Sequence, residues 1–315
     1  MIRTVTGDVS SEKIMNTLSH EHITFGKSGY IGDDDNCYSR ETAYKNALSR
    51  INMIKKYNVN LVVDATASEC GRDPLLLKKL SLDTGVLIVC STGFFKDEDN
   101  MLAVLKAMSY CSDLEKELTG FFIKEITDGI GDTGVRAGAV KTASSYNQIR
   151  PLEQVIMKAA AQAALACGVP VLTHCDRGTM AKAQAEVMLS MKIPPEKVII
   201  GHMTSCRNLD EIRFVMDRGF TAAFDQFGIL SIPGIPDDEE KTANLLALLR
   251  EGYEDRIVLS HDTMFDRMGY ISKSKPRYPD MVYKTILPYL RENGISEDTI
   301  RRITRENLLR ILDLD

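Results

Sequence analysis

Eight short segments suited to buried strands recur along the chain, and segments with helical periodicity separate them. Several, such as residues 60–66 (NLVVDAT) and 86–92 (VLIVCST), are apolar runs bounded by polar residues, as in strands buried on both faces of a sheet. Alternating strands and helices predict an α/β fold with a parallel sheet, and eight strands predict a closed (β/α)8 TIM barrel. A doubly wound open sheet is the rival, but none of the eight predicted strands is followed by a Gly-x-Gly-x-x-Gly. The strands are expected at residues 16–22, 60–66, 86–92, 135–141, 169–174, 197–202, 220–225 and 256–262.

The helical segments complete this plan. A Pro in the first turn and a Gly after the last mark helix ends, as at Pro151 and Gly168. The stretch 120–134 is ambiguous, because residues 123–126 fit a strand or a helical turn. Helices are expected at 41–57, 74–82, 99–118, 151–167, 179–191, 208–218, 239–251, 281–293 and 296–312, with a short N-terminal β-hairpin at 2–9. No linker composition divides the chain, so residues 1–315 are expected to form a single domain.

All five histidines stand at the ends of predicted strands. In His20-Glu21-His22 the two imidazoles project to the same side of a strand, which is a chelating arrangement for a transition metal. His174, His202 and His261 end three later strands. Because TIM barrels place their chemistry at the carboxyl ends of the strands, the histidine pattern predicts a metal site there.

Two further strand ends carry Lys141 and Asp262. Four imidazoles and a carboxylate exceed what one tetrahedral metal takes, and they suit two metals about 3.5–4 Å apart that share a bridging ligand. An ammonium cannot bind a cation. A buried lysine loses its proton more easily, and its reaction with carbon dioxide would give a carbamate bridge. Lys124, beside an apolar patch but followed by Glu125, is the competing lysine.

The motifs in this order resemble the phosphotriesterase family of the amidohydrolase superfamily over nearly the whole chain. They are residues 17–22 (TLSHEH), 71–73 (GRD), 136–141 (RAGAVK), 168–174 (GVPVLTH), 200–202 (IGH) and 259–262 (LSHD). The resemblance implies that His20, His22 and Asp262 hold the more buried metal and that His174 and His202 hold the more exposed one. It also implies that carboxylated Lys141 and a hydroxide bridge the two. Zinc is the first expectation, and imidazole and carboxylate ligands also accept manganese, cobalt or iron.

The expected activity is hydrolysis of an ester bond. The hydroxide would attack a carbonyl or phosphoryl centre, Asp262 would take its proton and return it to the leaving oxygen, and His261 would tune the site without binding metal. A basic cluster in the loops after strands seven and eight predicts an anionic substrate. Its members are Lys241, Lys275, Arg277 and Tyr278.

Among the family's activities, opening of phosphorylated sugar lactones fits best. Acyl-homoserine lactonases of the family carry Asp-Arg where this chain has Asp225-Gln226, so that activity, phosphotriesterase and carboxylesterase activity are alternatives. Two other classes stay open. A mononuclear deaminase would show His-x-x-Glu near strand six, whereas Met203, Thr204 and Ser205 follow His202. A silent metal-binding interaction protein would be expected to lack a ligand.

Composition bears on partners and compartment. A net charge of −5 without a basic run argues against nucleic acid, and no apolar run approaches membrane-spanning length. Seven irregularly spaced cysteines and a polar N-terminus suggest reduced thiols in a cytoplasmic protein. The resemblance implies a homodimer and a small-molecule substrate.

Overall fold

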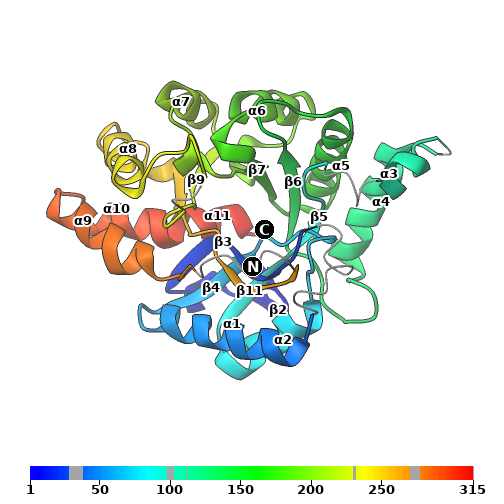
Figure 1. Cartoon of the computed structure of the whole chain (residues 1–315), viewed down its shortest axis with the longest axis horizontal. Coiled ribbons are helices and arrows are strands. Elements are labelled where there is room, and N and C mark those ends of the chain that lie inside the picture. The colour runs from blue at the N-terminus through cyan, green and yellow to red at the C-terminus, as the bar shows by residue number, and fades with distance from the viewer. Residues whose placement is uncertain (28–37, 98–102, 111, 230–231, 270–276, 315) are drawn as a thin grey trace.

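A parallel sheet surrounded by helices forms the body of the computed structural model, which describes all residues except 28–37, 98–102, 111, 230–231, 270–276 and 315 (Figure 1). The sheet runs in the order β10-β9-β8-β7-β6-β5-β4-β3-β11 with every pairing parallel. Its strands are β3 (Asn16–Phe25), β4 (Val59–Asp64), β5 (Leu87–Gly93), β6 (Ala139–Ser144), β7 (Val171–Cys175), β8 (Val198–Ile200), β9 (Thr221–Phe224), β10 (Ile257–Leu259) and β11 (Met264–Arg267). Strands β3 to β10 are the eight predicted ones in barrel order, which confirms the predicted fold.

Hydroxyl groups help to close the barrel between β3 and β10. The backbone N–H of His20 donates to Ser260 Oγ at 2.9 Å, and Ser19 Oγ donates to the Leu259 carbonyl at 3.1 Å. Two backbone hydrogen bonds follow, from Asp262 N to the His20 carbonyl and from His22 N to the Thr263 carbonyl, each at 3.0 Å. The last strand, β11, extends the sheet beside the end of β3, where Met264 pairs with His22. This closure brings the strand that carries His20 and His22 next to the segment that carries Asp262.

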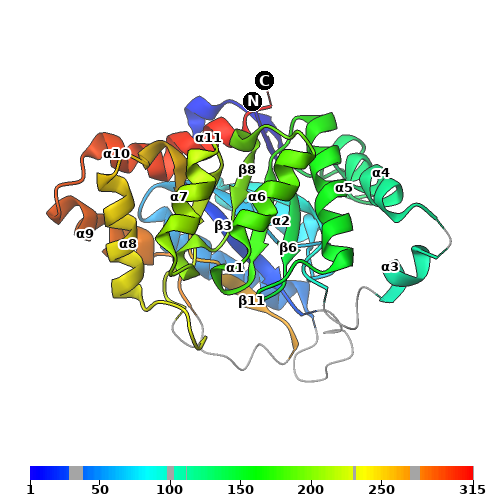
Figure 2. The ribbon, with the colours of Figure 1, turned by 90° about the horizontal axis from the view of Figure 1, so that it is seen from above.

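Alternation along the strands separates two apolar cores. In β4 the side chains of Leu61 and Val63 belong to the cluster inside the barrel, whereas Val62 packs toward the helices. The inner cluster also contains Ile2 from the N-terminal hairpin and Leu308 from the last helix. The amino end of the barrel is therefore filled with apolar side chains. The two termini lie side by side at that end (Figure 2), where Leu314 N donates to the Met1 carbonyl.

Helices surround the strands and follow one another along the chain in the predicted order. They are α1 (Arg40–Lys55), α2 (Pro74–Thr84), α3 (Ala103–Met108), α4 (Leu114–Thr127), α5 (Pro151–Cys167), α6 (Ala181–Ser190), α7 (Leu209–Asp217), α8 (Asp238–Arg250), α9 (Leu287–Glu292), α10 (Glu297–Arg301) and α11 (Asn307–Leu312). The π-helical turns Val282–Ile286 and Arg302–Glu306 belong to the last two predicted helical segments. The predicted hairpin is present as β1 (Ile2–Thr4) and β2 (Gly7–Val9). None of the described helices is long and apolar enough to cross a membrane.

Two predicted segments differ from the structure. The strand expected at 135–141 begins only at Ala139, because Ala137 N donates to the Glu125 carbonyl and Gly138 packs against the backbone of Arg3. The expected start of the helix at 99–118 lies outside the described residues. The described part of this segment forms two helices, α3 and α4. Asp113 accepts a hydrogen bond from Lys116 N and starts a new helix. This helix enters the ambiguous stretch and ends at Thr127, so residues 123–126 are helical.

Candidate metal centre

Six predicted residues come together at the carboxyl ends of five strands. Five of them are buried, and His174 is half-buried. The structure places His20 and His22 on β3, Lys141 on β6, His174 on β7, His202 just after β8 and Asp262 just after β10.

Their polar atoms point toward one another. Nε2 of His20 lies 2.9 Å from Nζ of Lys141, and Nε2 of His202 lies 2.6 Å from Nδ1 of His174. Oδ1 of Asp262 lies 3.1 Å from Nε2 of His22. Ligand atoms of His20, His202 and Asp262 all lie within 4.8 Å of one another. The residues that the resemblance divides between two metals therefore form one continuous cluster.

Asp225, which follows β9, orients two of these rings. Its Oδ2 lies 3.0 Å from Nδ1 of His20, while its Oδ1 accepts from both the backbone N–H and Nδ1 of His202, each at 3.0 Å. Burial opposes ionisation of this carboxyl group, but the nearby histidines outweigh it and lower the pKa of Asp225 to about 2. No role was predicted for Asp225 from the sequence, although its position at the end of a predicted strand was a signal for one. A carboxylate that fixes the outer nitrogen of a ring turns the inner nitrogen toward the site.

The tautomers implied by these contacts fit a cation. Burial and the charge of Lys141 lower the pKa of His20 to about 3, so its single proton lies on Nδ1 toward Asp225 and its Nε2 carries a lone pair. For His22, Nδ1 lies 2.9 Å from the Thr66 hydroxyl, which itself donates to Asp64, so Nδ1 is the donor there. Nε2 of His22 then faces the Asp262 carboxylate with a lone pair. Two acceptors at that distance need a shared proton or cation, and the donor set suits a divalent metal.

Lys141 is distinguished from Lys124 by burial. Lys141 is 1% exposed, and burial lowers its pKa to about 8, although nearby carboxylates oppose the shift. Lys124 is an exposed residue of α4. Only a neutral amine adds carbon dioxide, so Lys141 has the environment that a carbamate requires.

Gln226 is bound at each of its polar groups and fixes the second oxygen of Asp262. Its Nε2 donates to Asp262 Oδ2 at 2.9 Å, and its Oε1 accepts from the Ser205 hydroxyl at 2.5 Å. Its backbone donates to Thr204 and accepts from Lys241. Burial raises the pKa of Asp262, but the neighbouring imidazoles of His22, His202 and His20 hold it well below the usual range. Asp262 is thus a fixed carboxylate, with a left-handed backbone at φ 53°.

His261 is turned away from the cluster. Its Nδ1 lies 2.9 Å from Glu21 Oε1, and its Nε2 accepts from the backbone N–H of Val282 at 2.9 Å. Both ring nitrogens are engaged, so the geometry suits support of the Asp262 segment.

The structure does not bring the predicted basic cluster together. Lys241 is fully buried, and its ammonium donates at 2.8 Å to the carbonyls of Gln226 and Ile229 and to Asp238, which uses all three of its protons. Tyr278 is half-exposed under the guanidinium of Arg50. Lys275 lies outside the described residues. Arg277 alone adjoins the site, where its guanidinium donates to the carbonyls of His261 and Asp262.

The chain matches known proteins over nearly its whole length. A model described as the phosphotriesterase family matches residues 1–312. The solved structure of an organophosphorus hydrolase from Deinococcus radiodurans is 34% identical, with a TM-score of 0.95 and coverage of 99% of this chain and 96% of that one. A variant of a PTE-like lactonase from the same organism is 34% identical, with a TM-score of 0.94 over 99% of this chain and 100% of that one. An aryldialkylphosphatase from Saccharolobus solfataricus is 26% identical over 308 residues, which are 95% of each chain.

Proposed function

The chain belongs to the phosphotriesterase family, and from that premise we propose that it is a metal-dependent lactonase that opens a phosphorylated sugar lactone. Membership makes it a hydrolase acting on ester bonds. The convergence of four imidazoles, Lys141 and Asp262 on one point carries the proposal of a metal-dependent reaction. The lactone assignment draws on a relative described as a PTE-like lactonase. A cytoplasmic homodimer remains the prediction from sequence.

We assign the residues as follows. His20, His22 and Asp262 would hold one divalent cation, His174 and His202 a second, and a carbamate on Lys141 would join them. Zinc is the first candidate, with manganese, cobalt or iron compatible with the same ligands. Bound cations would polarise the lactone carbonyl and lower the pKa of water. The Asp262 carboxylate would take the proton from the attacking water and return it to the leaving alkoxide, a general acid–base role.

Metal analysis tests this assignment. We expect two divalent ions per chain in active enzyme, loss of activity after chelation, and recovery when metal is returned. Because a ligand that binds only the folded state stabilises it, the midpoint of thermal unfolding should also rise with added metal. Elemental analysis and thermal melts measure both. One ion per chain in fully active enzyme would contradict the binuclear assignment.

The anionic substrate is supported by Arg277. Its guanidinium lies against the backbone of Asp262, and two of its N–H groups are used by the carbonyls there. Guanidinium has five donors, so others are available for a phosphate or carboxylate. Lys241 is not proposed as a ligand, because its three protons already have acceptors within the protein.

Replacing Arg277 with alanine should therefore reduce kcat/KM roughly tenfold to a hundredfold for a phosphorylated lactone, and far less for the neutral lactone of the same ring. A charge-assisted hydrogen bond is worth about 1.5–3 kcal/mol, and only the phosphorylated substrate offers the partner. Steady-state kinetics on the matched pair of lactones measures the difference. Lys241→Met is the contrast, since it should lower thermal stability and affect both lactones alike. An equal loss on both lactones in Arg277→Ala would remove Arg277 from substrate binding.

Hydrolysis of a phosphotriester is the second candidate, favoured by an aromatic wall beside the cluster. The ring centroids of Phe95 and His174 are 4.6 Å apart, and those of Phe25 and His22 are 4.9 Å apart. Two of the relatives are described as an aryldialkylphosphatase and an organophosphorus hydrolase. Assays with an aryl dialkyl phosphate and an acyl-homoserine lactone alongside the sugar lactones rank these activities.

A further inference from the structure

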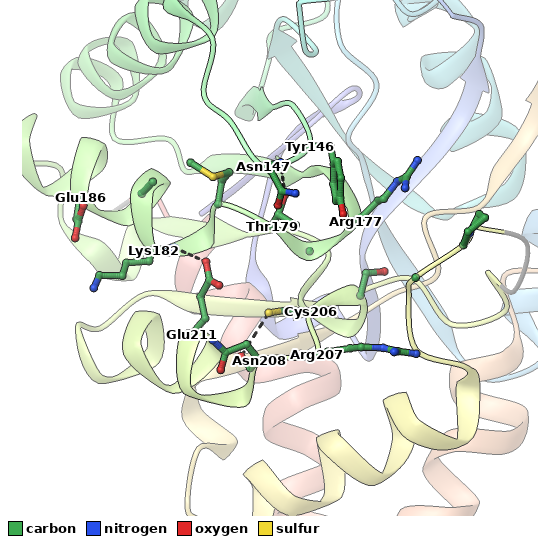
Figure 3. A pocket seen from close by; sticks show the side chains of 16 residues that line it. Tyr146, Asn147, Arg177, Thr179, Lys182, Glu186, Cys206, Arg207, Asn208 and Glu211 are labelled. Atoms are coloured by element: carbon green, nitrogen blue, oxygen red, sulfur yellow. Dashed lines mark hydrogen bonds between the residues drawn. The ribbon is translucent and has the colours of Figure 1, made fainter.

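A pocket of about 510 Å³ lies among the loops that follow β6, β7 and β8 (Figure 3). Ser205 forms part of its wall. The Ser205 hydroxyl donates to Gln226, and Gln226 donates to Asp262. A single side chain, that of Gln226, thus links the pocket wall to the carboxylate proposed to move the proton.

A tight contact between two loops sets two arginines at the pocket. A Cβ on Gly178 would lie 2.3 Å from the backbone nitrogen of Cys206, so the two backbones touch and only glycine fits. Arg177 precedes this contact and Arg207 follows it. Arg177 has a left-handed backbone with φ 52°, an unfavourable conformation for a residue with a side chain. The fold therefore keeps Arg177 in a strained conformation while it lines the pocket.

The charges of the pocket are divided between its ends. Figure 3 shows Arg177 and Arg207 toward one end and Lys182 and Glu186 toward the other. The Arg177 guanidinium stacks 4.7 Å from the centre of the Tyr146 ring, and no carboxylate of the described residues pairs with it. Within the described part of the chain, the polar contacts of the Arg207 guanidinium are long, at 3.5 Å to Glu240 and 3.4 Å to the Ile235 carbonyl, and its side chain is 58% exposed. Both guanidiniums retain donors for a ligand.

We propose that the Arg177 end of this pocket binds a compact oxyanion, a phosphate group, between the guanidiniums of Arg177 and Arg207. Planar guanidinium donors match phosphate and bind it in bidentate fashion. The phosphate is either that of the substrate, in which case the site rests on the proposed function and takes this phosphate in place of Arg277, or free inorganic phosphate. This site is separate from Arg277, which follows β11 and contacts the segment after β10.

Binding of inorganic phosphate to the metal-loaded enzyme tests the site without any assay of hydrolysis. We expect isothermal titration to show that phosphate binds about tenfold more weakly to each single variant, Arg177→Gln and Arg207→Gln, than to the wild type. Each substitution removes charge-assisted hydrogen bonds. Lys182→Gln is the matched control. It removes the same charge from the other end, where the ammonium lies over the Phe214 ring, and should leave the affinity as in the wild type. Phosphate held only by the metals would not respond to either arginine variant.

Kinetics on the phosphorylated and neutral lactones then distinguishes the two sources. If the substrate's phosphate occupies the site, the ratio of kcat/KM between the two lactones falls in both arginine variants, and inorganic phosphate competes with substrate. If the occupant is free phosphate, binding weakens in the variants but that ratio is unchanged. Phosphate affinities equal in wild type, Arg177→Gln and Arg207→Gln would overturn the proposal. Failure to hydrolyse any lactone would reject the proposed function and leave the binding result interpretable.

Discussion

Replacing Lys141 with alanine should lower kcat/KM by more than about 100-fold and reduce the metal content of the purified protein. Loss of a group that only orients a metal ligand costs 10–100-fold in affinity or activity, so loss of a shared ligand should cost more. The Lys141 amine is buried 2.9 Å from Nε2 of His20, at the point where the predicted ligands converge. Alanine cannot form a carbamate, so the variant lacks the anionic group proposed at that point.

Two readouts separate this role from a general packing defect. Protein equilibrated with ¹³C-labelled bicarbonate should show a carbamate resonance in the wild type that is absent from Lys141→Ala. Short carboxylic acids supplied with metal should restore part of the lost activity, because they replace the missing anionic bridge. Lys124→Ala, which removes an exposed lysine of α4, is the control and should retain full activity and metal content. Full activity in Lys141→Ala would mean that the amine has no part in the site.

The barrel could be predicted because its signal is local. Runs such as 60–66 alternate between the barrel interior and the helix layer, and their apolar residues identify a strand wherever they occur. The ends of elements depend on contacts distant in sequence. The backbone N–H of Ala137 donates to the Glu125 carbonyl and not to a neighbouring strand, and α4 starts at a cap that the helical pattern alone did not reveal. Such contacts cannot be seen in a window of sequence.

The inner residues of the candidate site were predicted because strand ends of one barrel meet at one face. Their supports were not. Asp225, at the end of β9, contacts two histidine rings. The sequence pointed only to the residue after it, Gln226. Lys241 was grouped with Arg277 by charge, yet a lysine in a loop and a lysine buried under three acceptors look the same in sequence. Whether the protons of a lysine already have acceptors within the protein depends on the fold. Charge alone therefore predicted too many members for the basic cluster.

The second large effect is expected at Asp262. Changing it to asparagine should lower turnover about 10²–10⁴-fold, the usual contribution of one acid–base group, while some metal is kept. Asparagine retains the size of the side chain but cannot carry the proton. Since Gln226 donates to Oδ2, the asparagine oxygen is expected to face Gln226, and its NH₂ group then faces the ring of His22. Metal affinity should therefore fall as well, and metal analysis beside kcat measures the two losses separately.

Gln226→Leu is the companion variant, because it removes the amide and leaves the carboxylate. If Asp262 acts through its charge and its fixed orientation, Gln226→Leu should show a smaller loss of kcat than Asp262→Asn and keep its metal. Turnover near that of the wild type in Asp262→Asn would reject the shuttle role. His261 could not then take over the proton, because its Nδ1 is bound to Glu21 and its Nε2 already accepts from Val282. The proton would then have to leave by a route that does not involve His261, and Ser205, which Gln226 links to Asp262, would be the next residue to change.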